Sequence, residues 1–155
     1  MNAKRLFGAI CITLAMSILP LPEWLSVIRP AWVLLLVLYI QYYSPKQFHL
    51  SLVVFLGLCL DVLMASIIGE HIFSLVLSAW IGSIFFRRFH FFLASQQIFI
   101  IFILTLTYQA SLSAMDAFLG DSFFLMSLLG VPLLSCLVWP WVCILLNNNT
   151  QHGYR

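Results

Sequence analysis

Charged residues are scarce in this chain. Only 8% of its 155 residues are Asp, Glu, Lys or Arg, whereas 63% are hydrophobic. A soluble domain carries roughly 25% charged residues, so this chain lacks the polar side chains needed to cover a water-facing surface. Its formal net charge of +2 is also too small to indicate a nucleic acid as a partner. These shortages predict a protein whose outer surface faces lipid.

Sequence motifs for catalysis and for metal or cofactor binding are also missing. There is no HExxH, no GxSxG, no Walker loop and no histidine pair at ligand spacing. The four cysteines lie in separate apolar runs, which predicts reduced packing residues rather than a metal site. Asp61 and Asp116 could form an aspartyl dyad, but Asp116 lacks the asparagine-containing motifs of membrane aspartyl peptidases. We therefore expect no enzyme activity and no cofactor.

Continuous apolar runs fill most of the chain. They do not alternate with polar residues, which favours membrane-spanning helices over barrel strands. Because a helical span takes about 20 residues, six short-looped spans use up the whole chain as one transmembrane domain. The predicted spans cover residues 6–19, 30–43, 48–65, 71–86, 91–115 and 123–146. The second is short for a bilayer about 30 Å thick, so it must extend, thin the lipid or sit against longer neighbours.

The basic residues are distributed unevenly between the two sides of this arrangement. With the N-terminus inside, Arg29 is the only basic residue in an outer segment. The cytoplasmic segments then hold Lys4, Arg5, Lys46, Arg87, Arg88 and Arg155, and the outer connections hold the acids Glu23, Glu70, Asp116 and Asp121. Cytoplasmic loops of membrane proteins carry an excess of Lys and Arg. We therefore predict a multi-pass protein with both termini in the cytoplasm.

Asp61 is the one carboxylate within an apolar run. An ionised carboxylate in hydrocarbon costs roughly 2.5–3.5 kcal/mol on insertion scales, so Asp61 should face protein or water. Gly57, Asp61, Ala65 and Gly69 are each four residues apart and would share one helix face if the helix continued that far. Small residues at this spacing let helices approach closely. We interpret the stripe as a seam, that is, a helix face of small residues that packs closely against another helix, in which Asp61 makes a fixed polar contact. The alternative is a ligand, ion or proton site.

Arg29 is the predicted partner of Asp61. It precedes the second span, directly before Pro30, while Asp61 lies about one turn from the outer end of the third span. An arginine–carboxylate pair can form two parallel hydrogen bonds. We therefore expect this pair to join the outer ends of the two helices.

The fourth span carries a second line of small residues, Ser74, Ser78 and Gly82. We expect this line to pack against another helix, with a pore lining as the alternative. Glu70 and His71 precede it in a short outer turn, where an exposed and solvated pair is expected.

The sixth span contains two prolines, Pro132 and Pro140, each of which removes a backbone hydrogen bond and should kink the helix. Trp139 and Trp141 flank Pro140 and are predicted to anchor the inner membrane interface. Trp80 falls deeper in its span and should pack between helices.

Several short motifs follow one another at characteristic spacing. They are Leu-Pro-Glu-Trp-Leu at 21–25, Arg-Pro-Ala-Trp-Val-Leu-Leu at 29–35, Gly57 to Asp61 with Ala65 and Gly69 after it, and Val-Trp-Pro-Trp at 138–141. In this order, within a six-span chain, they resemble the bacterial rod shape-determining protein MreD family. Position 31 departs from the family pattern, which has Asn or Asp there, and position 65 has Ala where Gly is common.

The resemblance implies a non-enzymatic inner-membrane component of the machinery that guides lateral peptidoglycan synthesis. It implies MreC, the MreB filament and membrane-bound peptidoglycan synthases as partners, and a fold similar to the substrate-binding subunits of energy-coupling-factor transporters. We predict that one of the two small-residue seams receives the transmembrane helix of MreC. The alternative function is a small-molecule-binding subunit of an uptake transporter, with an outward pocket near Arg29, Asp61 and Gln109.

Overall fold

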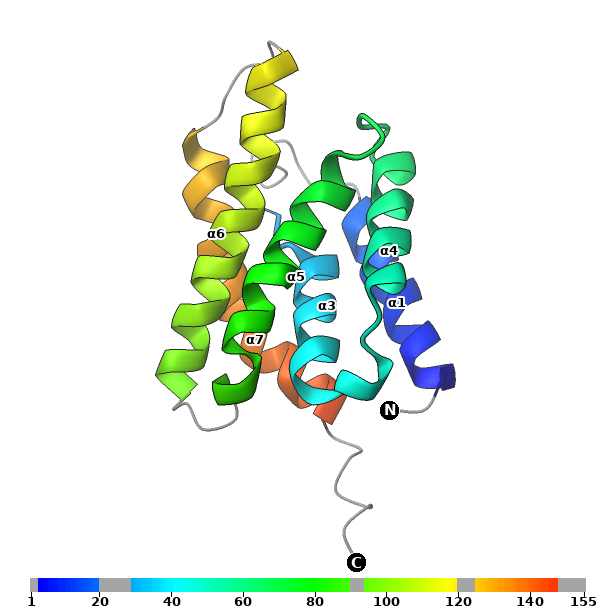
Figure 1. Ribbon diagram of the computed structural model, residues 1–155, viewed down its shortest axis with the longest axis vertical. Helices are drawn as coiled ribbons and strands as arrows, with labels where there is room; N and C mark the ends of the chain where they lie inside the picture. The colour runs from blue at the N-terminus through cyan, green and yellow to red at the C-terminus, as the bar shows by residue number, and fades with distance from the viewer. Residues whose placement is uncertain (1–2, 20–28, 90–93, 120–124, 148–155) are drawn as a thin grey trace, which may run out of the picture.

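The computed structural model describes residues 3–19, 29–89, 94–119 and 125–147, and this part of the chain is helical throughout apart from short connections (Figure 1). It contains six α-helices and one 3₁₀ turn. In chain order they are α1 (Ala3–Ile18), α3 (Trp32–Tyr43), η1 (Pro45–Gln47), α4 (Leu50–Leu63), α5 (Glu70–Phe89), α6 (Ala94–Leu119) and α7 (Leu125–Asn147). The predicted all-α class is confirmed for the described residues.

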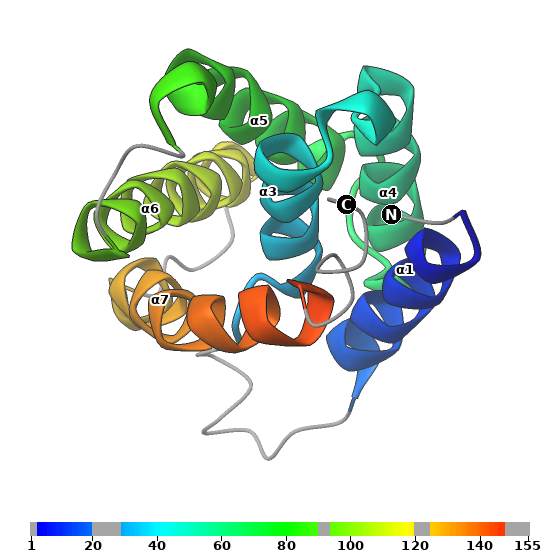
Figure 2. The same ribbon diagram turned by 90° about the horizontal axis from the view of Figure 1, so that it is seen from below.

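The helix α3 occupies the centre of the bundle. Ten of its twelve residues are buried, and Figure 2 shows it enclosed by the other helices, of which α1, α5 and α7 pack directly against it. A helix that is apolar on all sides is suited to such a position. Twelve residues rise only about 18 Å, and α3 can be this short because it sits against longer neighbours.

The two ends of the bundle differ in which connections they carry. The start of α1, the turn η1 and the ends of α5 and α7 lie at one end, which we call the inner end (Figure 1). The turn between α4 and α5 and the end of α6 lie at the other, which we call the outer end. Because α3 is short, it begins well below the outer ends of its neighbours.

The outward sides of the surrounding helices are apolar. Large exposed hydrophobic side chains occur on each of them, among others Phe7, Val62, Ile84, Phe99 and Leu137. By length and composition, Ser95–Phe118 and Leu128–Leu146 could cross a membrane, whereas the other apolar helices are shorter. An apolar exterior around an apolar core is typical of a protein surrounded by lipid.

The tryptophan predictions were partly wrong. Trp139 is 2% exposed and belongs to the core cluster around α3, so it does not lie at the surface, where an interfacial anchor would be found. Trp80 was expected between helices but is 67% exposed, since the inward face of α5 is taken by its small residues. Both Pro132 and Pro140 lie inside α7.

Candidate functional site

Asp61 closes the turn between α4 and α5. Its buried carboxylate accepts a hydrogen bond from the backbone N–H of Gly69 at 2.7 Å and another from that of His71 at 2.9 Å. The His71 ring nitrogen Nδ1 lies 3.0 Å from the same carboxylate, and the Ser66 hydroxyl donates to it at 3.3 Å. The first N–H groups of a helix lack partners within the helix and carry a partial positive charge. Asp61 therefore caps the start of α5 from the neighbouring helix.

The stripe predicted from Gly57 to Gly69 is broken by the end of α4. Ala65 adopts a left-handed conformation with φ of 51°, and the N–H of Ser66 donates to the Asp61 carbonyl oxygen at 3.1 Å. This pattern is a Schellman motif, which ends a helix and favours glycine at the left-handed position. Ala65 and Gly69 consequently lie in the turn, and they do not share a helix face with Gly57.

Arg29 does not pair with Asp61, contrary to the prediction. Its guanidinium donates to the carbonyl oxygens of Ser17 at 2.7 Å and Leu19 at 2.9 Å, at the C-terminal end of α1. Helix C-terminal carbonyls attract cations because they lack intrahelical partners. Within the described ranges the only ion pair joins Asp61 and His71. The Asp61 carboxylate therefore already has its hydrogen-bond partners in the turn after α4 and at the start of α5.

Both small-residue seams are occupied by helices of this chain. A Cβ atom added at Gly57 would lie 2.6 Å from the Cα atom of Ile72, so α4 and α5 touch backbone to backbone there. On the other seam, Gln41 donates to the Ala79 carbonyl oxygen at 2.9 Å, and Tyr42 donates to that of Gly82 at 3.1 Å.

Ser74 and Ser78 on the second seam are fully buried. Helices of this chain therefore cover both seams, which does not favour the predicted docking of MreC on them. The sequence of a small-residue line does not reveal which helix packs against it. Only the contacts in the folded structure identify that helix.

Glu70 and His71 are not the exposed pair that was expected. Glu70 is 8% exposed and is the first residue of α5, directly before the predicted fourth span. Burial, followed by the charge and hydrogen bond of Asp116 and the charge of Asp61, raises the pKa of Glu70 to about 7. Asp116 thus associates with Glu70, and no dyad with Asp61 forms. The sequence did not predict this association of Glu70 with Asp116, because the two residues lie far from each other along the chain.

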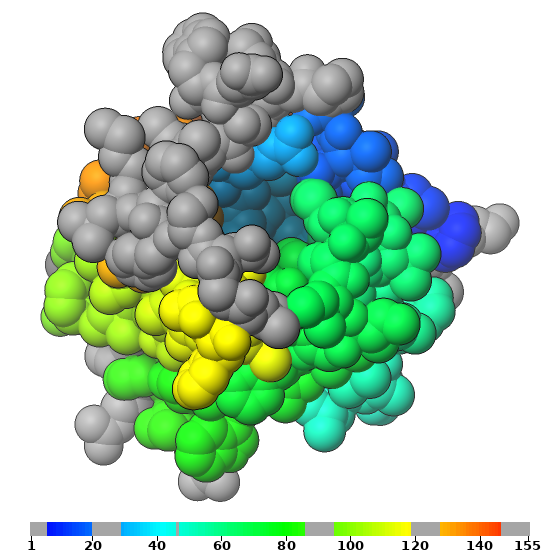
Figure 3. Space-filling model, turned by 90° about the horizontal axis from the view of Figure 1, so that it is seen from above, coloured from blue at the N-terminus to red at the C-terminus, as the bar shows by residue number. Residues whose placement is uncertain are grey.

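A cavity of about 130 Å³ lies at the outer end, above the start of α3. Figure 3 shows the hollow from this side. Its polar lining comes from several helices and consists of Ser17, Arg29, Trp32, His71, Tyr108 and Gln109. The predicted outward pocket thus includes Arg29 and Gln109, while Asp61 is absent from its lining.

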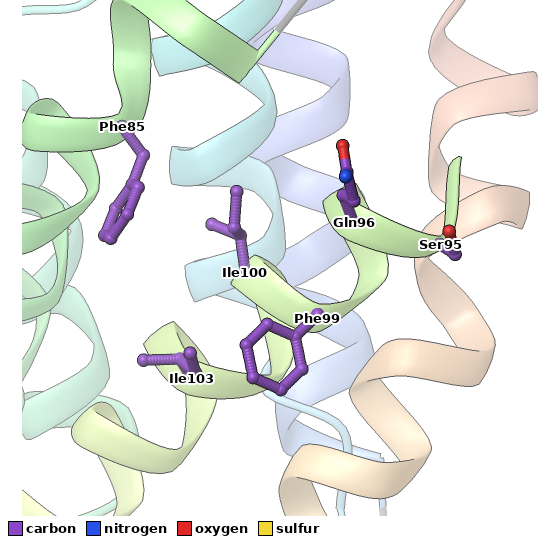
Figure 4. Close-up of a pocket in the computed structure, with 6 residues that line it drawn as sticks. All are labelled: Phe85, Ser95, Gln96, Phe99, Ile100 and Ile103. Atoms are coloured by element: carbon purple, nitrogen blue, oxygen red, sulfur yellow. The ribbon is translucent and has the colours of Figure 1, made fainter. Parts of the chain in front are cut away.

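A larger and more open groove of about 400 Å³ lies between the inner parts of α5 and α6 (Figure 4). It is lined by Phe85, Ser95, Gln96, Phe99, Ile100 and Ile103. None of these side chains titrates, so the groove offers apolar contact rather than acid–base chemistry. Elsewhere in the described residues, no group of three or more His, Cys, Asp or Glu side chains could hold a metal ion.

Comparison with known proteins places these features in one family. The family model for the rod shape-determining protein MreD matches residues 4–149. A relative from Haemophilus influenzae, named rod shape-determining protein MreD, is 27% identical over 142 residues, which cover 88% of this chain and 85% of that protein. No solved structure matches the chain. The match over nearly the entire length shows that this chain belongs to the rod shape-determining protein MreD family.

Proposed function

We propose that this chain is a non-enzymatic, six-span component of the inner-membrane rod complex, which binds MreC within the bilayer and helps to organise lateral peptidoglycan synthesis. The observation that carries the proposal is the family match over residues 4–149. Membership supports a role in rod-shape determination, and the family is one of membrane proteins that are shape-determining rather than known enzymes. MreB and the wall synthases would then be reached directly or through MreC.

The packing of the bundle supports a single transmembrane domain with six spans. Four of the helices have apolar stretches that are too short to qualify as spans by length alone, but α3 lies inside the bundle, and α4 and α5 each pack against a longer helix. The start of α1 and the end of α7 share one end of the bundle with η1 (Figure 1). This arrangement agrees with cytoplasmic termini, as the excess of basic residues on that side predicts.

We assign the MreC contact to the outward face of α4. This helix has 14 residues, which rise about 21 Å, and it packs chiefly against α5. A length of about 21 Å falls short of a hydrocarbon core about 30 Å thick. A full-length partner helix alongside α4 would cover this mismatch. The outward face carries the exposed side chains of Val54, Leu58 and Val62, spaced four residues apart.

Bulky substitutions test this face against a matched control. Leu58→Trp should reduce the amount of MreC that co-purifies with the chain by about tenfold or more, since interface packing is disrupted by an oversized side chain. Leu137→Trp places the same side chain on the outward face of α7 and should leave co-purification unchanged. Equal recovery of MreC with both stably inserted variants would remove α4 as the contact.

The uptake-transporter alternative is favoured only by the position of the outer cavity. Its volume of about 130 Å³ is small beside the roughly 300–1,000 Å³ of typical small-molecule sites. Depletion of the chain separates the two functions. Loss of rod shape with normal solute uptake supports the rod-complex function, whereas loss of uptake in cells that remain rods supports the transporter.

A further inference from the structure

The outer cavity is lined by a positively charged side chain. Arg29 lines it, and among the described lining residues there is neither Asp nor Glu. A guanidinium has five N–H donors, of which two reach the carbonyl oxygens of α1. The Nε group is among those that find no partner in the described part of the chain. A cation enclosed in this way normally has a counter-ion.

The start of α3 adds further donors at the floor of the cavity. Ala31 provides no side-chain cap; its own N–H donates to Ser135 Oγ of α7 at 3.2 Å, and that of Trp32 donates to the Pro30 carbonyl oxygen at 2.9 Å. The next free N–H groups of the helix, those of Val33 and Leu34, make no hydrogen bond among the described residues, and both residues line the cavity. The partial positive charge of a helix N-terminus favours an anion at this place.

Two polar side chains of α6 also line the cavity. Tyr108, which is 6% exposed, lies there together with Gln109. A hydroxyl and an amide N–H can each donate a hydrogen bond to a ligand held at this place. Asp61 is not among the described lining residues, and its oxygens already accept hydrogen bonds from Ser66, Gly69 and the backbone of His71.

We propose that this cavity binds a phosphate group. The available donors come from Arg29, the first turn of α3, Tyr108 and Gln109, and together they exceed the roughly four acceptor positions of a carboxylate. A volume of about 130 Å³ matches about four waters at roughly 30 Å³ each, which is room for one compact oxyanion. The site goes beyond the proposed function in the rod complex and does not depend on MreC binding.

The test measures the melting temperature of the purified, detergent-solubilised chain in phosphate-free buffer. Inorganic phosphate should raise it saturably, by about 3–6 °C at ten times the dissociation constant, while chloride at equal ionic strength should not. Tyr108→Phe should weaken the response, and Tyr39→Phe, in α3 but outside the lining, should retain it. An equal response of both variants would overturn the site.

A second variant supplies the anion from within the chain. Ala31→Asp places a carboxylate beside Arg29 and the start of α3. It should raise the melting temperature without phosphate and abolish the phosphate response. This variant tests the site without replacing Arg29. The contacts of Arg29 with α1 stay intact, so the protein should still fold. A full phosphate response in Ala31→Asp would contradict the proposal.

Two further arms identify the source of the phosphate. In phosphatidylcholine nanodiscs, stabilisation by inorganic phosphate indicates a free ion, whereas stabilisation only after phosphatidic acid is added indicates a lipid headgroup. Either result supports the site if Ala31→Asp removes it. Glu23→Gln checks whether the acid of the preceding connection occupies the cavity. A phosphate response seen only in Glu23→Gln, or in no sample, would show that the cavity is not a phosphate site.

Discussion

Single polar residues at the outer end satisfy the ends of neighbouring helices. Asp61 accepts hydrogen bonds from the first N–H groups of α5, and Arg29 donates to the last carbonyl groups of α1. In lipid, an unpaired backbone group costs several kcal/mol because water is absent. Each ionic side chain therefore stabilises the end of a neighbouring helix.

The first prediction concerns the independence of these two residues. Asp61→Ala should lower the free energy of unfolding by about 2–4 kcal/mol, because two buried N–H groups lose their acceptor. Arg29→Ala should cost less, and the double variant should show the sum of the two effects to within about 0.5 kcal/mol. Urea unfolding in detergent measures all three. A coupling energy well above this margin would restore the Arg29–Asp61 pair.

The second prediction concerns Ala65, whose left-handed conformation has φ of 51°. Ala65→Gly should stabilise the protein by about 0.5–1 kcal/mol, since a left-handed L-residue costs roughly 1–2 kcal/mol and glycine avoids most of this cost. Ala114→Gly in the exposed middle of the last turns of α6 serves as the control and should destabilise by a similar amount. Equal signs for both substitutions would argue against the Schellman motif.

The third prediction concerns pH. The pKa of Glu70 is raised from 4.5 to about 7 in the folded chain, so its contribution is fully present below about pH 4.5 and is lost as the pH rises towards 7. Glu70→Gln should therefore be more stable than the parent at pH 8, and the difference should vanish towards pH 4.5. Asp116→Asn should shift the transition to lower pH. Melting curves recorded from pH 4.5 to 8 give the comparison, and a constant difference would contradict it.

At the level of helices, the close contacts of α5 hold the bundle together. Its small residues allow α4 to touch it at Gly57 and allow Gln41 and Tyr42 of α3 to reach its carbonyl groups. Packing and interhelical hydrogen bonds drive such association because lipid offers no hydrophobic advantage. The small-residue lines are therefore used inside the fold.

The fourth prediction grades three Gly→Ala substitutions by the space at each Cβ position. Gly57→Ala meets the backbone of Ile72 at 2.6 Å and should destabilise by at least about 1–3 kcal/mol. Gly82→Ala meets side-chain atoms of Gln41 and Tyr42 at 3.1 and 3.2 Å, which can shift, so its effect should be smaller. Gly8→Ala meets nothing within 4 Å and should be neutral or stabilising. Melting temperatures in any other order would contradict the packing.

At the scale of the whole molecule, the described residues have almost no volume outside their helices. The fifth prediction follows from the position of their ends (Figure 1). A reporter that is active only in the cytoplasm should be active when fused after residue 155 and inactive when fused after Ala117 at the outer end of α6. A reporter that is active only outside the cytoplasm should give the opposite pattern. Matching activities at both positions would contradict the orientation.

The amino-acid sequence by itself determined the helical class, the approximate positions of the helices and the family. These follow from long apolar runs, prolines, and the order of short motifs, all of which are local along the chain. The sequence also showed that the second predicted span is short. It did not show the reason, which is that α3 lies at the centre of the bundle among longer helices.

Only the tertiary structure decided which residues meet. The central place of α3, the capping of α5 by Asp61 and the contact of Arg29 with α1 all join segments that are distant along the chain or related through a turn. A carboxylate, an arginine and a glycine line have several chemically acceptable partners in lipid. The three-dimensional packing selects among them, because each polar group must be satisfied by whichever partner lies within hydrogen-bond distance.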